Sequence, residues 1–318
     1  MHHKALIVAV ALTLTGTVNT TSATQLLRTF VSPTGNDLND CSLGAPCRHL
    51  QAALAQTQAG GEIAVLGTAG YNGGTTVTID KAISIVNPGG YEAGIFVPSG
   101  GSGIVINAGT SDAVSLIGLT VEGGGTGYYG IQFNTGESLT IENCVIRHLA
   151  AQGQGVIFTP SASSNLSISH SLIADSAGYG VVVYPSGSGT VSAMFNRVEV
   201  NNNAGGISIA GSGSTGTVSS TVFDSVINGN KNGAGFEVFT ATGHAPTTLM
   251  LIHSVVARNY FGLDVEGPAA TARLNMSTVT GNNIGWYSNS GASVLSYGNN
   301  SIDGNGVNET APPSVALK

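Results

Sequence analysis

Short apolar segments and polar turns alternate along most of the chain and return at a regular interval. A glycine that precedes a short apolar strand recurs at intervals of 25, 25, 26, 29, 27 and 23 residues. These glycines are Gly130, Gly155, Gly180, Gly206, Gly235, Gly262 and Gly285. Each unit then contains a polar turn, a second strand, and a tail rich in asparagine and glycine. Repeats that carry strands and no helix predict a solenoid, in which each coil stacks on the previous one.

Alignment of the units without gaps across the second strand gives one column that is aliphatic throughout. Its members are Val145, Leu172, Val198, Val226, Val255, Val279 and Ile302. We expect this column to face the interior, because stacked coils bury a continuous apolar core. The next position upstream holds mostly small residues and includes Cys144, which we interpret as a structural residue.

Two polar columns flank the aliphatic one. The column two residues earlier predicts a ladder of turn side chains that bond to neighbouring backbone; it consists of Asn143, His170, Asn196, Asp224, His253, Ser277 and Asn300. The column three residues later predicts a second turn, because asparagine and glycine tolerate left-handed backbone conformations. It consists of His148, Asp175, Asn201, Gly229, Arg258, Asn282 and Asn305.

The fold that fits this pattern is all-β: a single-stranded right-handed parallel β-helix with a short N-terminal capping helix. A βαβ protein would place helices between the strands, the left-handed β-helix has a six-residue repeat, and a leucine-rich repeat needs a fixed leucine and asparagine pattern. A β-sandwich is the remaining alternative, and the agreement within the columns disfavours it. Weaker coils precede the repeats, around residues 83–85, 104–106 and 114–116.

The domain organisation follows from these elements. Residues 48–56 have helix-forming composition, with Leu50, Ala53, Leu54 and Thr57 on one face, and would cover the open end of the stack. We therefore expect a strand and capping helix within residues 24–60, β-helix coils over 61–306, and a flexible tail over 307–318.

The first 23 residues have the features of an export signal. A polar start with Lys4 precedes an apolar run over residues 5–14, and Thr21-Ser22-Ala23 forms a small-residue cleavage site. The run is shorter than the ~20 apolar residues that span a bilayer. We therefore expect a secreted or periplasmic protein whose mature chain starts near Thr24 and has no membrane span.

Cysteine usage agrees with an oxidising compartment. Cys41 and Cys47 flank a short segment with glycine and proline, which predicts a disulfide across a surface loop. A zinc site is disfavoured because no matching second pair follows. The charge balance excludes a nucleic-acid partner: the formal net charge is −7, and the 10 lysines and arginines are scattered.

Three segments at the start of the chain resemble the opening of secreted pectin-lyase-like β-helix proteins. They are residues 29–37 (TFVSPTGND), 46–53 (PCRHLQAA) and 60–63 (GGEI). The resemblance implies the β-helix fold with a cap. Catalytic members of that superfamily cleave acidic polysaccharides, either with carboxylates that hold calcium and a basic residue, or with clustered aspartates and a Gly-His-Gly segment. Here His244 lies in Gly243-His244-Ala245-Pro246, and the coils contain no aspartate pair.

Candidate site residues come from neighbouring coils. Asp224 and His253 fall in one column, where a carboxylate could orient an imidazole and raise its basicity, and Arg197 could bind a sugar carboxylate. His148 and Asp175 form a second pair, as candidate binding residues. The alternative for both pairs is a turn ladder or a solvated surface. We expect no metal site, because Glu142, Glu199 and Glu237 do not share a column.

Three classes of function remain open at this point. The first is a protein that contacts an extracellular polysaccharide or cell-surface partner without a clear catalytic centre. The second is a pectate-lyase-like or polygalacturonase-like enzyme that acts on acidic polysaccharide. The third is a structural or adhesive surface protein. We expect no cofactor; calcium would be required only for the lyase.

Overall fold

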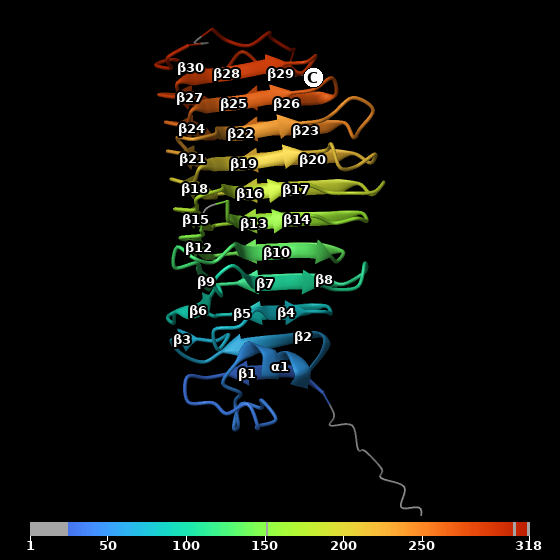
Figure 1. Cartoon of the computed structure of the whole chain (residues 1–318), viewed down its shortest axis with the longest axis vertical. Coiled ribbons are helices and arrows are strands. Elements are labelled where there is room, and N and C mark those ends of the chain that lie inside the picture. The colour runs from blue at the N-terminus through green and yellow to red at the C-terminus, as the bar shows by residue number, and fades with distance from the viewer. Residues whose placement is uncertain (1–24, 151, 308–309, 317–318) are drawn as a thin grey trace, which may run out of the picture.

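The chain winds into a tall stack of β-strand coils with one short helix at its lower end (Figure 1). This computed structural model describes residues 25–150, 152–307 and 310–316. Every strand pairing in these residues is parallel, and each coil contributes one strand to each of three sheets. The predicted right-handed parallel β-helix is therefore confirmed. The expected export signal lies outside the described residues.

Sheet 1 has eleven strands in the described part of the chain. They are β1 (Leu26–Val31), β2 (Thr57–Val65), β5 (Ile83–Val86), β8 (Ala113–Ile117), β11 (Ser138–Glu142), β14 (Ser164–Ser169), β17 (Val191–Asn196), β20 (Val218–Phe223), β23 (Thr247–Ile252), β26 (Ala270–Asn275) and β29 (Ser293–Ser296).

Sheet 2 follows sheet 1 in each coil and has ten described strands, most of them three residues long. They are β3 (Ala69–Gly70), β6 (Ala93–Phe96), β9 (Leu119–Glu122), β12 (Val145–Arg147), β15 (Leu172–Ala174), β18 (Glu199–Asn201), β21 (Val226–Asn228), β24 (Val255–Ala257), β27 (Thr278–Thr280) and β30 (Ser301–Ile302).

Sheet 3 completes the coil with nine described strands. They are β4 (Val77–Ile79), β7 (Ser102–Asn107), β10 (Tyr129–Thr135), β13 (Gln154–Phe158), β16 (Tyr179–Val183), β19 (Gly205–Ala210), β22 (Ala234–Phe239), β25 (Phe261–Glu266) and β28 (Ile284–Asn289).

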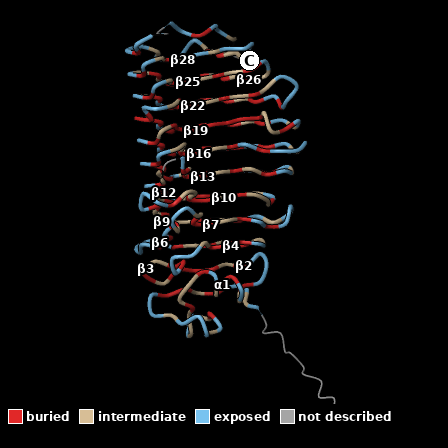
Figure 2. The backbone as a smooth tube through the Cα atoms, viewed as in Figure 1, coloured by how far each residue is buried: buried red, intermediate tan, exposed pale blue. Residues whose placement is uncertain are grey.

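The interior is a continuous apolar column that runs the length of the stack (Figure 2). Alternate residues of each strand point inward, as the pleat requires, and equivalent residues of successive coils lie on top of one another. The rings of Phe133 and Phe158, which are register partners on β10 and β13, stack inside with centroids 4.4 Å apart. Stacking of like residues thus replaces the interdigitation of an ordinary two-layer core.

The aliphatic column predicted for the second strand was placed one residue too early. Val145, Leu172, Val226 and Val255 are register partners on sheet 2, but they face outward, and the last two are 37% and 36% exposed. The inward column is the next residue of each strand, as in Ile146, Ile173, Ile227 and Val256. Aliphatic residues occupy both faces of these short strands, so hydrophobicity alone did not identify the inner one. Of the predicted column, Val198 and Val279 are buried and Ile302 packs against the core.

A single residue in the left-handed backbone region turns the chain from sheet 1 to sheet 2. Positive φ values of 48° to 54° occur at Asn143, His170, Arg197, Asp224, His253 and Met276. The predicted turn is therefore confirmed, with Arg197 in place of Asn196 and Met276 in place of Ser277. The predicted ladder of backbone hydrogen bonds lies one residue later: the hydroxyl of Ser254 accepts from the Ser225 N–H at 3.1 Å, and that of Ser277 accepts from the Ser254 N–H at 3.2 Å.

A second left-handed turn leads from sheet 2 to sheet 3 and encloses a ladder of buried asparagines. Asn203, Asn230, Asn259, Asn282 and Asn305 stack on successive coils and are at most 6% exposed. Each side-chain oxygen accepts the backbone N–H of the equivalent residue below, and each amide donates to a carbonyl of sheet 2, such as Val200 for Asn230. The ladder satisfies the polar groups that a tight turn would otherwise bury unpaired.

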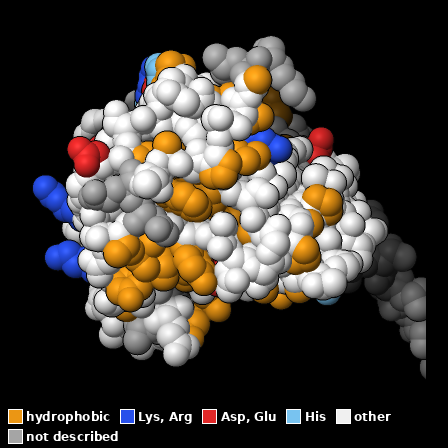
Figure 3. All heavy atoms as spheres, turned by 90° about the horizontal axis from the view of Figure 1, so that it is seen from above, with side chains coloured by type: hydrophobic (Ala, Val, Ile, Leu, Met, Phe, Trp, Pro, Cys, Tyr) orange, Lys and Arg blue, Asp and Glu red, His pale blue; other side chains and the backbone are white. Residues whose placement is uncertain are grey.

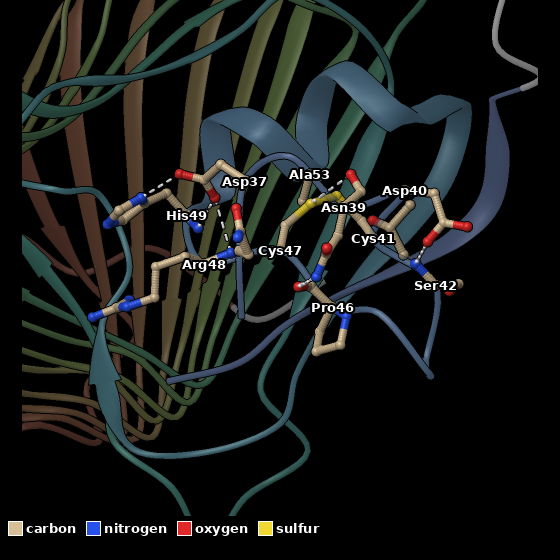
Figure 4. The surroundings of a disulfide bond; sticks show 12 residues. Asp37, Asn39, Asp40, Cys41, Ser42, Pro46, Cys47, Arg48, His49 and Ala53 are labelled. Carbon is tan, nitrogen blue, oxygen red and sulfur yellow. Dashed lines mark hydrogen bonds and ion pairs between the residues drawn. A yellow bond between two sulfur atoms is a disulfide. The ribbon is translucent and has the colours of Figure 1, made fainter. Parts of the chain in front are cut away.

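The helix α1 (Leu50–Gln56) closes the lower end of the stack, as predicted. Leu50, Ala53 and Leu54 are its buried residues, and the buried Thr57 hydroxyl at its C-terminal end donates to the Ala53 carbonyl at 2.7 Å. The predicted Cys41–Cys47 disulfide is present beside this helix (Figure 4). Cys144 is a buried free thiol, in agreement with its interpretation as a structural residue.

At the other end, residues after the last strand lie against the final coil. The Ser296 N–H donates to the Pro313 carbonyl, and the indole N–H of Trp286 donates to the Thr310 carbonyl at 2.8 Å. Seen from this end, charged side chains are few and apolar side chains gather over part of the surface (Figure 3). No helix in the described residues is long and apolar enough to cross a membrane.

Candidate functional site

The turn from sheet 1 to sheet 2 aligns five outward side chains along the stack. We call this row the corner ridge and define it as His170, Arg197, Asp224, His253 and Met276. The Arg197 Nε lies 3.8 Å from an Asp224 oxygen, and the His253 Nδ1 lies 3.6 Å from the other. The predicted Asp224–His253–Arg197 group is therefore brought together by coil stacking.

The surroundings of the corner ridge are open. Arg197 and His253 are 60% and 47% exposed, and the separations of 3.6–3.8 Å exceed hydrogen-bond length. The His253 ring stacks on Phe223 with centroids 5.9 Å apart, and its Nε2 lies 3.2 Å from the Met276 sulfur. Solvent screens such a group, so the ridge has the geometry of a charged surface row and lacks an enclosed reaction site.

The second predicted pair lies at the turn from sheet 2 to sheet 3. The His148 Nε2 is 3.8 Å from Asp175, while its Nδ1 is only 2.9 Å from Glu122. Glu122 also receives a hydrogen bond from the Arg147 Nε at 2.8 Å. Sequence analysis missed Glu122 as the main partner of His148, because it lies one coil below the aligned units.

Above this pair, the same turn forms a groove along the stack. A concavity of about 580 Å³ is lined by Asp175, Ser176, Ala177, Asn202, Asn203, Ala204, Gly229, Lys231 and Asn232. It shares Ala177, Ala204 and Asn232 with a neighbouring concavity that contains Gln154 and Tyr179, and it shares Lys231 with another that contains Arg258 and Tyr260. These three concavities are contiguous, and we refer to them together as the axial groove.

The axial groove contains two cations without a partner. Lys231 and Arg258 are exposed, lie on neighbouring coils, and line the same concavity. Among the described lysines and arginines, the side chains of these two and of Arg273 on sheet 1 make no hydrogen bond or ion pair, whereas the other side chains do. In a chain of net charge −7, a pair of uncompensated cations in a hollow is a local site for an anion.

A cluster that sequence analysis missed lies on the outer face of sheet 3, next to the groove. Glu237 and Asp264 are register partners on β22 and β25, and the Ser208 hydroxyl donates to Glu237 at 2.5 Å. Tyr179, which also lines the groove, lies near enough to Glu237 and Asp264 for their negative charges to raise the pKa of its hydroxyl group. Glu237 and Asp264 each lie two residues after the glycine that opens their unit, and this spacing is the sequence signal that pairs them.

The environment shifts two ionisable groups of this cluster. Burial, together with the charges of Glu266 and Glu237, raises the pKa of Asp264 to about 6. Burial also raises the pKa of Tyr179, with further contributions from Glu237 and Asp264. Raised pKa values of this kind are typical of proton-transfer sites, and they also occur in structural carboxylate pairs.

Among the described residues, no group of three or more His, Cys, Asp or Glu side chains is arranged to hold a metal ion. The Glu237 carboxylate accepts a hydrogen bond from the Ser208 hydroxyl, which is a donor group. Calcium would need several oxygen ligands converging on one point.

Comparison with known proteins identifies the fold and leaves the activity open. Residues 102–307 match the family model described as the right handed beta helix region. Among solved structures, the pectate lyase Pel9A is 17% identical with a TM-score of 0.56, and the match covers 91% of this chain and 78% of that one. The alginate lyase from Paenibacillus sp. str. FPU-7 is 15% identical with a TM-score of 0.61, over 91% of this chain and 98% of that one. No curated protein sequence matches the chain.

Proposed function

The chain belongs to the right-handed β-helix family, and we propose that it is a secreted protein that binds an acidic polysaccharide along the axial groove. The observation that carries this proposal is the contiguity of three concavities over successive coils. Secretion rests on the expected export signal at residues 1–23.

The shape of the groove suits an extended chain of sugars. Coils stack at ~4.8 Å, so each successive coil adds its own side chains to the groove at that repeat. Its lining offers amides at Asn202 and Asn232, a carboxylate at Asp175, and rings at Tyr179 and Tyr260. Amides and carboxylates bond to hydroxyl groups, and rings pack on the apolar faces of sugars.

The charge of the groove favours an acidic polymer over a neutral one. Lys231 and Arg258 lack partners within the described residues and stand one coil apart, so a polymer with carboxylates at similar spacing would contact both. Two solved structures with similar folds are a pectate lyase and an alginate lyase. This similarity supports an acidic polysaccharide as the ligand of this chain.

The proposal is tested by affinity electrophoresis of the chain in gels that contain polygalacturonate, alginate, xylan or pullulan. We expect retardation by at least one of the two acidic polymers, weakened by salt, because exposed ionic contacts are screened within ~8 Å at 0.15 M. The Lys231→Ala/Arg258→Ala double variant should lose retardation, whereas Arg273→Ala, which removes an unpaired cation from sheet 1, should keep it.

Other outcomes would replace the proposal. Retardation that survives the double variant would move the binding surface away from the groove, and the corner ridge with Arg197 would then be the next surface to substitute. Absence of retardation by all four polymers would overturn polysaccharide binding and favour a structural or adhesive role.

A further inference from the structure

We propose that Asn232 is a modification site, at which the backbone nitrogen of Gly233 converts the side-chain amide into a carboxyl group and so adds a negative charge to the axial groove. The modification is a reaction of the chain with itself and does not depend on the proposed function. Its effect on polysaccharide binding does rest on that function.

Asn232 lies in a turn that is two residues longer than the equivalent turns of other coils. In three other coils the ladder asparagine precedes the next repeated glycine by three residues, as Asn259 precedes Gly262. Here Asn230 precedes Gly235 by five. Asn232 is exposed and lines the concavity of about 580 Å³. The longer turn therefore places this side chain at the surface of the groove, outside the buried ladder.

The asparagine–glycine pair occurs four times in the chain, and the structure holds three of these pairs in place. Asn72 and Asn305 are buried, and their side-chain amides donate to backbone carbonyl groups. Asn228 lies on β21, and the N–H of the glycine that follows it donates to the Ala257 carbonyl at 3.0 Å. The four pairs are Asn72–Gly73, Asn228–Gly229, Asn232–Gly233 and Asn305–Gly306.

Neither reacting group of the Asn232–Gly233 pair is held in this way. The Asn232 side chain is exposed and makes no hydrogen bond to a described residue. The Gly233 N–H donates to the Asn230 carbonyl at 3.4 Å, which is longer than the usual range of about 2.7–3.2 Å. Because glycine has no side chain, its nitrogen can approach the preceding side chain with little steric hindrance.

The reaction balances with water as the only co-reactant. The Gly233 nitrogen gives up its proton and forms a bond to the Asn232 Cγ, and the amide nitrogen leaves with that proton as ammonia. The product is a succinimide ring. Water then opens the ring at either of its carbonyl groups, which gives an aspartate or an isoaspartate at position 232. The net change replaces ammonia by water and creates one carboxyl group, which is ionised at neutral pH.

A carboxylate at position 232 changes the charge of the groove close to its cations. Asn232 shares one concavity with Lys231 and with Asp175. The new charge would offset that of Lys231, add to that of Asp175, and repel an anionic polymer. Exposed charges interact weakly in water, so we expect binding of an acidic polysaccharide to weaken about 2- to 5-fold.

The experiment follows the four asparagines separately on one sample. The chain is incubated at pH 8 for several weeks and digested with trypsin, and mass spectrometry measures the conversion of amide to carboxyl in each peptide. Peptide 232–258 contains no other asparagine and no glutamine, so a change of its mass is assigned to Asn232. Cleavage after lysine and arginine places each pair in its own peptide, and these peptides are residues 49–81, 198–231, 232–258 and 274–318.

We expect conversion at Asn232 to exceed that at each of the other three pairs by about tenfold or more, because those pairs react only after local opening of the fold. In urea, all four pairs should convert at similar rates, since the fold no longer holds three of them. Asn232→Gln should prevent the change in peptide 232–258, because its longer side chain would have to close a larger and less favourable ring.

The binding arm uses variants in the affinity gels described above. Asn232→Asp reproduces one product of the reaction and should be retarded less than the native chain by the acidic polymer that binds it. Asn165→Asp, at an exposed position on sheet 1, should be retarded as the native chain is. Circular dichroism of each variant shows whether a change of retardation reflects a change of fold.

The outcomes separate the modification from the function of the groove. In the folded chain, an unchanged Asn232, or conversion at another pair as fast as at Asn232, would overturn the proposal. Equal retardation of Asn232→Asp and the native chain would overturn the effect on binding and leave the modification. Absence of retardation of the native chain would overturn the proposed function and the effect on binding together, whereas the peptide masses decide the modification by themselves.

Discussion

Asn230 and Asn259 are joined twice: the backbone N–H and the side-chain amide of Asn230 both donate to the Asn259 Oδ1, at 3.0 and 2.9 Å. Asn259 in turn donates to the Ile227 carbonyl at 3.2 Å. The pair is buried inside the turn from sheet 2 to sheet 3, where water cannot replace these bonds. The Asn259 side chain therefore satisfies three polar groups of the neighbouring coil.

We expect Asn259→Ala to destabilise the fold by about 3 kcal/mol, because it leaves buried donors on Asn230 and a buried carbonyl on Ile227 without partners. The matched control is Asn228→Ala, which removes an amide from the outer face of sheet 2 on the same coil as Asn230 and should change stability by less than about 0.5 kcal/mol. Urea unfolding measures both. Equal losses of stability in the two variants would show that a ladder asparagine stabilises the fold no more than an asparagine on the outer face.

The register of sheet 2 is tested by two neighbouring valines. Val255 is 36% exposed and Val256 is fully buried, so a hydroxyl group is solvated at the first position and buried at the second. We expect Val256→Thr to cost about 2 kcal/mol and Val255→Thr to cost less than about 0.5 kcal/mol. The reverse order in thermal or urea unfolding would restore the register that the sequence columns suggested.

The raised pKa of Asp264 gives a pH dependence of defined sign. Its folded pKa of about 6 lies above the ordinary value of 3.8, so the folded state binds the proton more tightly than the unfolded state does. Its favourable contribution is complete below pH 3.8 and is lost as the pH rises through 6. Asp264→Asn, which cannot ionise, should therefore raise the urea midpoint relative to the native chain at pH 7.5 and give little difference at pH 4. Asp80→Asn, at an exposed position, should change the midpoint at neither pH.

The three cysteines predict a simple thiol count. Cys41 and Cys47 are joined, and burial raises the pKa of the Cys144 thiol to about 11, so no thiolate is accessible in the folded chain. Ellman's reagent at pH 8 should detect no thiol in the native protein and one after denaturation without reductant. Rapid reaction of the native protein would show either that Cys144 is accessible or that the disulfide is absent.

Much of the fold could be predicted from the sequence because its repeating features are local. The glycine that opens each unit, the left-handed turn at Asp224 and His253, and the apolar face of α1 at Leu50 and Leu54 each follow from neighbouring residues. Their physical causes, which are backbone conformation and burial of one helix face, act over a few positions along the chain.

The inner face of sheet 2 could not be predicted in this way. The pairs Val226–Ile227 and Val255–Val256 are aliphatic at both positions, and unequal loops shift the alignment between coils, so Arg197 and Met276 were displaced by their neighbours Asn196 and Ser277. The hydrogen bonds of the inner serines and asparagines decide the register, and they join residues 23–29 positions apart. Only the stacked structure shows which residues those are.

The candidate site was predictable in part. Asp224 and His253 could be paired because they share the turn column, whereas Glu237 and Asp264 are paired by the register of sheet 3. The groove was beyond prediction, since its walls come from loops of unequal length. Lys231 and Arg258 became notable only when the partners of the other cations were known.

The left-handed turns of the corner ridge separate backbone shape from side-chain identity. Histidine, arginine, aspartate and methionine all occupy this position with nearly the same φ, because the serine and asparagine bonds inside the turn hold the backbone. Such conformations cost non-glycine residues about 1 kcal/mol each, and the stack bears that cost whichever side chain is present. A lineage of such proteins could therefore exchange the outward residues coil by coil, and acquire new surface chemistry, while the scaffold beneath stays the same.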